Sequence, residues 1–109
     1  MEKTEKINAL MQRELAQAML KEIEAKDYLV TLSFVKCSPD LKTAKVGVSI
    51  LPTNFTGTAL RELRKKSGIL AKELRKKTKW KRVPTLEWKV DRSAEEDERM
   101  RKEIEEIIK

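Results

Sequence analysis

The residues best suited to chemistry in this sequence are lysines and arginines, and they gather in one stretch. Positions 61–82 hold eleven basic residues and two acidic ones, Glu62 and Glu73, so the stretch carries +9 while the whole 109-residue chain carries +7. Basic side chains neutralise phosphate groups, and the pI of about 9.6 exceeds the value of about 9 that is typical of nucleic-acid binders. Because the charge is concentrated, we favour a nucleic-acid partner over an evenly charged, merely solubilising surface.

The predicted RNA-binding residues are the basic side chains of this stretch, the Ser-Gly pair within it and one tryptophan. They are Arg61, Arg64, Lys65, Lys66, Ser67, Gly68, Lys72, Arg75, Lys76, Lys77, Lys79, Trp80, Lys81 and Arg82. The ring of Trp80 could stack on an unpaired base or pack under the end of a sheet, and both interpretations stay open. Trp88 alternates with Leu86 and Val90, which is typical of a core position.

Chemistry other than binding has little support in the composition. The chain has no histidine, the usual general base and transition-metal ligand, and its single cysteine, Cys37, cannot build a zinc site or an internal disulfide. Residues 66–68 match a fragment of a phosphate-binding P-loop, but the preceding glycine spacing is missing. We therefore predict no catalytic residue, no metal, no cofactor and no small-molecule substrate.

The sequence also bears on where the protein works. No apolar run is long enough to span a membrane, and the N-terminus carries no secretory signal. A single cysteine suits a reducing compartment. We predict a cytoplasmic protein without a membrane partner, and we expect a monomer.

Hydrophobic periodicity predicts four helical segments. Apolar residues at every fourth position from Ile7 to Ile23 predict a first helix of about five turns. Two short helices that meet at Ser67-Gly68 are predicted between residues 58 and 82, and a final helix is predicted over residues 93–109. The apolar stripe of that final helix consists of Met100, Ile104, Ile107 and Ile108.

Alternation of apolar and polar residues predicts three strands, over residues 28–38, 43–50 and 85–90. In the first strand, Val30, Leu32 and Phe34 are expected to share one face. The alternation slips after Phe34, which indicates a bulge or a stretch that is buried on both sides.

The order helix, strand, strand, kinked helix pair, strand, helix predicts an α+β fold of two layers, a three-stranded sheet with helices packed on one face. The short link at residues 38–41 predicts an antiparallel hairpin, and the long helical excursion before the third strand permits a parallel crossover. This is the layout of a KH domain of the second topological type. We predict one domain over residues 1–109, with a core over 1–92 and a C-terminal helix over 93–109.

The predicted kink occupies the place of a known RNA clamp. In RNA-binding KH domains a Gly-x-x-Gly loop between two helices holds the backbone of four nucleotides. The equivalent residues here are Lys65 to Gly68, so the first glycine is a lysine and the clamp is incomplete. Gly68 could permit the kink, or it could simply end one helix as a cap.

Three segments form a pattern whose order and spacing together are specific. They are residues 35–41 running into 44–46, Ser67-Gly68 at the kink, and residues 84–88 continuing to Asp91 and Ser93. In this pattern the sequence resembles the ribosome-binding factor A family, bacterial assembly factors for the small ribosomal subunit, over nearly the whole chain.

The resemblance implies a KH-like fold in which an interrupted helix with an Ala-x-Gly kink replaces the clamp. It implies binding to the free small (30S) subunit and to its 16S rRNA near the decoding region, help in late rRNA maturation, and no catalysis. Two positions depart from the pattern. Lys66 stands at the alanine of the kink, and Asp97 stands where a glycine often precedes an Arg-Ile pair, here Arg99 and Met100.

Two other functions are compatible with the residues. The first is a generic KH-like RNA-binding protein without a link to ribosomes, although the incomplete clamp argues against sequence-specific recognition of single strands. The second is a protein-interaction module whose basic face meets an acidic partner.

Overall fold

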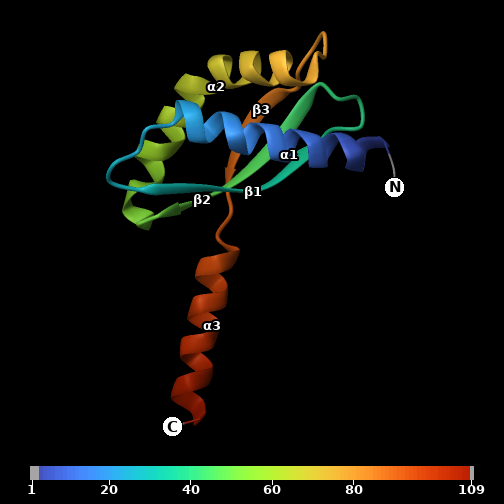
Figure 1. Cartoon of the computed structure of the whole chain (residues 1–109). Coiled ribbons are helices and arrows are strands. Elements are labelled where there is room, and N and C mark those ends of the chain that lie inside the picture. Colours follow the sequence, from blue (N-terminus) through green and yellow to red (C-terminus); the bar gives the residue numbers. More distant parts are fainter. Residues whose placement is uncertain (1–2, 109) are drawn as a thin grey trace.

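The computed structural model describes residues 3–108, with the backbone alone for residues 94–98 and 108. The elements follow in the order α1 (Lys3–Glu22), β1 (Leu29–Cys37), β2 (Thr43–Leu51), the 3-10 turn η1 (Thr53–Phe55), α2 (Thr56–Thr78), β3 (Thr85–Val90) and α3 (Ser93–Ile108) (Figure 1). The predicted α+β class is confirmed. Within the described residues, no helix combines the length and the apolar character needed to cross a membrane.

The sheet has the strand order β1-β2-β3, with β1 antiparallel to β2 and β2 parallel to β3. Both predicted pairings are therefore confirmed. The hairpin link is held by Asp40, whose carboxylate accepts hydrogen bonds from the Ser38 hydroxyl at 2.6 Å and the Lys42 amide at 3.0 Å. These two bonds lower the pKa of Asp40 below its usual value.

A bulge in β1 changes which face its side chains occupy. Leu32 pairs with Val48 and Phe34 pairs with Gly47, so Ser33 is one extra residue in the strand. A one-residue insertion moves the following side chains to the opposite face. The predicted slip is confirmed, but the expectation that Phe34 shares the face of Leu32 is wrong, because Phe34 lies on the open side of the sheet.

Helices α1 and α2 cover the other face of the sheet, and the core lies between the layers (Figure 1). Each helix contributes an apolar stripe with the periodicity expected of a half-buried helix. The fully buried large side chains are Met11 and Leu15 from α1, Val46 and Val48 from β2, and Leu63, Leu70 and Leu74 from α2.

Helix α2 is one continuous helix over Thr56–Thr78, so the prediction of two helices meeting at Ser67-Gly68 is wrong. Figure 1 shows it rising along one side of the molecule and then running across the top, so the continuous helix is bent. The Ser67 hydroxyl donates to the Leu63 carbonyl at 2.9 Å and accepts from the Trp88 indole N–H at 2.7 Å. A serine that bonds back to the preceding turn bends a helix, and a Ser-Gly pair is a common place for such a bend.

Helix α3 leaves the sheet and extends away from the two layers (Figure 1). The expectation of helices packed on one face therefore holds for α1 and α2 but not for α3. Its Met100, Ile104 and Ile107 side chains are 63%, 52% and 84% exposed, and the side chain of Ile108 lies outside the described residues. The Asp91 amide still bonds to the Val48 carbonyl at 2.7 Å, so only Arg92 separates the last residue bonded to the sheet from the start of α3.

Candidate nucleic-acid interface

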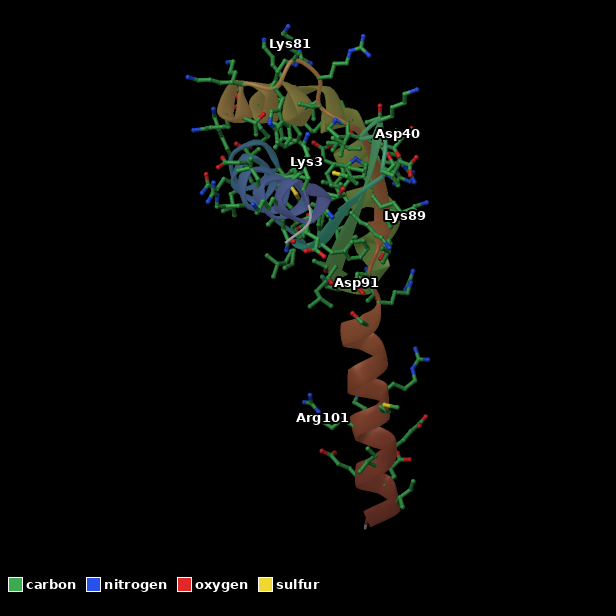
Figure 2. The ribbon with its side chains drawn as sticks, turned by 90° about the vertical axis from the view of Figure 1, so that its right-hand side faces the viewer. Lys3, Asp40, Lys81, Lys89, Asp91 and Arg101 are labelled. Atoms are coloured by element: carbon green, nitrogen blue, oxygen red, sulfur yellow. The ribbon has the colours of Figure 1, made fainter. Side chains whose placement is uncertain are left out.

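The basic side chains of α2 and of the segment that follows it form one continuous feature, which we call the basic ridge. Its members are Arg61, Arg64, Lys65, Lys66, Lys72, Arg75, Lys76, Lys77, Lys79, Lys81 and Arg82. All of them are exposed except Lys66, which is half-buried. Figure 2 shows Lys81 directed outward at the end of the molecule opposite α3. The structure thus brings together the basic residues that the sequence predicted.

The two acidic residues of this stretch face the protein rather than the ridge. The Glu73 carboxylate lies 3.6 Å from the Lys21 ammonium of α1, and its side chain is only 17% exposed. Glu62 is half-buried near Tyr28, whose pKa is raised by burial and then by the charge of Glu62. The exposed charged side chains of α2 are therefore all basic, although Ile69 between them is 44% exposed. Within residues 3–108 no ion pair joins the ridge to an acid of the chain.

Helix electrostatics explains only part of this charge. Cations near the C-terminus of a helix are stabilised by its macrodipole, which accounts for Arg75, Lys76 and Lys77 in the last turn. The effect fades within one turn, so it gives no reason for the basic residues farther back, such as Arg64 and Lys72. Those side chains are available to an external anion.

The residue that ends α2 is also unusual. Lys79 adopts a left-handed backbone conformation, with φ 60° and ψ 21°, and its amide donates to the Arg75 carbonyl at 2.8 Å. Glycine is favoured at this position, since a side chain there costs about 1 kcal/mol. A lysine here places one more cation on the ridge at a cost in backbone strain.

Comparison with known proteins identifies the family. A family model described as ribosome-binding factor A matches residues 3–104. This chain belongs to the ribosome-binding factor A family. The ribosome-binding factor A of Chlorobaculum parvum is 36% identical over 98% of this chain and 88% of its own length, and that of Opitutus terrae is 31% identical over 96% and 87%.

Solved structures of family members share the fold. A crystal structure of ribosome-binding factor A from Thermus thermophilus matches with a TM-score of 0.69 and 24% identity, over 80% of this chain and 93% of that one. A Thermus thermophilus homology model, fitted into a cryo-EM map of a complex of that factor with 30S, matches with a TM-score of 0.67 and 26% identity, over 78% and 91%. The KH-like α+β fold is thus shown for this member.

The two residues at the bend of α2, Ser67 and Gly68, differ in their surroundings. The Ser67 hydroxyl is hydrogen-bonded to the Leu63 carbonyl and to the Trp88 indole N–H, and it stabilises the bend on the side of α2 that faces the sheet. Gly68 keeps a negative φ and is exposed, and no atom outside its own helical turn lies within 4 Å of the place where a β-carbon would stand. The surface above Gly68 is therefore open to close approach by a ligand. The bend forms with Lys66 at the position where the resemblance places an alanine.

The Trp80 ring packs against the protein, which was one of its two interpretations. It is half-buried, contacts the core, and lines a small cleft together with Ile7, Leu41, Arg82 and Pro84. Sequence reasoning treated Trp88 only as core and missed its bond to Ser67. The signal that could have found this bond is chemical, because a buried indole N–H needs an acceptor.

The acidic and sulfur-bearing side chains of the described residues bear on metal binding and on nucleophilic chemistry. Within them, no group of three or more His, Cys, Asp or Glu side chains lies close enough to hold a metal ion. The Cys37 thiol is buried, donates to the Met11 sulfur at 3.4 Å, and has its pKa raised by burial. A protonated, enclosed thiol is a poor nucleophile.

Proposed function

We propose that this protein is a non-catalytic ribosome biogenesis factor that binds the free small (30S) ribosomal subunit and its 16S rRNA through the basic ridge, and that it assists late maturation of that RNA. The observation that carries the proposal is the outward face of α2, whose basic side chains are exposed while Glu62 and Glu73 point inward. The complex of the Thermus thermophilus relative with 30S supports the choice of partner. A cytoplasmic location follows from that partner.

The ridge suits the sugar-phosphate backbone of RNA. Lysine and arginine contacts to phosphates release counterions, so the affinity falls as salt rises. With six such contacts, raising the salt from about 50 to about 200 mM would weaken binding roughly 10³-fold. The open surface at Gly68 lets a strand approach the backbone of α2 at the place where KH domains hold nucleotides. Binding of this kind positions the protein on folded RNA without reading its sequence.

The proposed assistance to maturation needs a difference in affinity. A ligand shifts a conformational equilibrium only by as much as it prefers one state over the other. The protein would therefore bind an immature arrangement of the 16S rRNA more tightly than the mature one. Release would follow when maturation removes the preferred arrangement, and the protein itself would perform no chemical step.

The test is co-sedimentation with purified small subunits and with whole ribosomes, at low and at moderate salt. The ridge variant is Arg75→Glu with Lys76→Glu, and both side chains are exposed. A matched control, Arg99→Glu with Lys102→Glu, makes the same change in net charge at two exposed residues of α3, which extends away from the two layers (Figure 1). We expect binding to free small subunits but not to whole ribosomes, a loss with rising salt, and at least tenfold weaker binding for the ridge variant only.

Three outcomes would change the proposal. Equal binding to both particles, or to any competitor RNA, would make the protein a generic RNA binder. Binding that survives nuclease treatment of the complex would point to an acidic protein partner. Unchanged binding by a folded ridge variant would move the site away from α2.

A further inference from the structure

The open face of the sheet carries an aromatic ring that the basic ridge does not use. The bulge at Ser33 turns Phe34 onto this face, where it is 39% exposed. Its ring lies directly over Gly47, since a β-carbon added at Gly47 would stand 2.1 Å from Cε1 of Phe34. Only glycine leaves room for the ring there, so the ring is held against the sheet in a defined position.

Three lysines surround this ring on the same face. Phe34, Gly47 and Lys89 are successive partners across the three strands, and Lys36 and Lys45 form the neighbouring cross-strand pair. All three lysines are exposed. Figure 2 shows Lys89 on the side of the sheet that is turned away from α1.

The lysines are not explained by the stability of the protein alone. Lys36 lies directly opposite Lys45, and like charges in that arrangement are destabilising. Glu87 is the acid opposite Lys45, but within residues 3–108 none of the three lysines makes an ion pair. Lysines on edge strands hinder aggregation, which fits β1 and β3 but not Lys45 on the central strand.

The patch around Phe34 is distinct from the apolar end of the same face. Leu29 and Leu51 are cross-strand partners at that end and are 63% and 57% exposed. Between them and Phe34 lie Ser33 and Ser49, whose hydroxyl oxygens are 3.3 Å apart. The aromatic ring and the lysines therefore form one compact basic and aromatic patch.

We infer that this patch is a second RNA-binding surface, which takes unpaired nucleotides. A base stacks on the exposed side of the Phe34 ring, and Lys36, Lys45 and Lys89 bind the adjacent phosphates. Sheet-borne aromatic rings beside basic side chains are a general way to bind single strands, because every base has a face that can stack. The RNA partner rests on the proposed function, whereas the surface is new.

Two RNA surfaces on opposite sides would let one molecule bind two RNA segments at once. The basic ridge lies on the helical layer and the Phe34 patch lies on the open face of the sheet (Figure 1). One molecule can therefore hold a paired or folded RNA segment on one side and an unpaired segment on the other.

The test measures the affinity of the full chain for a fluorescently labelled single-stranded oligouridylate of about 12 nucleotides, by anisotropy over a range of salt. Phe34→Leu keeps an apolar side chain over Gly47 but removes the ring, and we expect about tenfold weaker binding. Replacing Lys36, Lys45 and Lys89 by Gln should reduce the slope of log affinity against log salt by about 2. The matched control replaces the exposed Lys6, Lys26 and Lys102 by Gln and should change both quantities less.

The same variants are then tested for co-sedimentation with small subunits, beside the ridge variant. Circular dichroism checks that each variant is folded, and if Phe34→Leu does not fold, the lysine variant decides. Oligonucleotide binding equal to that of the control overturns the second surface. If the ridge variant still fails to co-sediment, the proposed function stands without this surface. Subunit binding lost with oligouridylate binding intact would assign the patch to a protein partner and would also overturn the inference.

Discussion

Helices α2 and α3 are both rich in charge and both carry an apolar stripe, yet only α2 is packed. Leu63, Leu70 and Leu74 of α2 are fully buried, whereas Ile104 and Ile107 of α3 are 52% and 84% exposed. Helix α2 connects two strands of one sheet, so its ends are fixed and its stripe must lie on that sheet. Helix α3 follows β3 and extends away from the two layers (Figure 1). An apolar stripe thus predicts a helix, but the connections of the chain determine what the stripe contacts.

The largest effect should come from shortening one side chain in each stripe. Leu70→Ala leaves a cavity in the core and should lower the free energy of unfolding by about 2–5 kcal/mol. Ile104→Ala should change it by less than about 0.5 kcal/mol, because half of the side chain is already in water. Urea denaturation of both variants measures the difference. Equal losses would show that α3 packs on the core in solution.

The second effect concerns the bond that connects the bend of α2 to the sheet. Ser67→Ala leaves the buried Trp88 indole N–H without its acceptor and should cost about 1–3 kcal/mol. Thr78→Ala is the control, since the Thr78 hydroxyl makes the same type of bond, to the Leu74 carbonyl at 2.7 Å, and accepts from the Trp80 amide at 3.4 Å instead of from a buried side chain. Thermal and urea unfolding should show a clearly larger loss for Ser67→Ala. Similar losses for the two variants would mean that the indole bond contributes little.

Most of the fold could be predicted because its signals are local. The periods of the apolar residues predicted the three strands and the helical regions, although α2 is one bent helix and not two. The length of the first link predicted the hairpin, and the long helical excursion permitted the parallel crossover. The face of Phe34 could not be predicted, since Val30, Leu32 and Phe34 alternate regularly in the sequence and only the pairing with β2 shows the extra Ser33. The direction of α3 depends on packing that no local pattern contains.

The basic ridge was predictable from composition, whereas the arrangement around it was not. Eleven basic residues fall in the 22 positions 61–82, so most of the exposed surface of α2 and of the segment after it has to be basic. Glu73 falls three residues after Leu70 and next to Leu74, so the helical period alone could have placed it near the inner side. The bond from Trp88 to Ser67 joins residues 21 positions apart and needed the tertiary structure.

The third effect concerns Gly68, a residue of low helix propensity inside α2. Gly68 keeps a negative φ inside a continuous helix, and a β-carbon there would contact nothing beyond its own helical turn. Gly68→Ala should therefore raise the free energy of unfolding by about 0.5–1 kcal/mol, because alanine restricts the unfolded chain and favours helix. A loss of stability would instead show that glycine is needed for the bend. In the co-sedimentation assay, weaker binding by this stabilised variant would support close approach of RNA at Gly68.

The smallest effect is a pH dependence confined to the start of α3. The Asp91 carboxylate accepts from the Ser93 hydroxyl at 2.6 Å and the Ser93 amide at 3.0 Å, and these bonds lower the pKa of Asp91. A lowered pKa in the folded state means that the contribution is present above the unfolded value, near 3.9, and is lost as pH falls through the lower folded value.

The helical content of α3 should accordingly fall in acid, below about pH 4, in the wild type more than in Asp91→Asn, which keeps an acceptor oxygen but does not titrate. Circular dichroism and NMR amide shifts of Ser93 over pH 2–6 measure this difference, while the signals of the buried core residues should stay unchanged in comparison with Asp91→Asn. The two proteins differ only at residue 91, so the difference between their curves reports on Asp91. Identical curves would mean that α3 is held by its own helical bonds, and a change in core signals specific to the wild type would mean that the link at Asp91 couples α3 to the sheet.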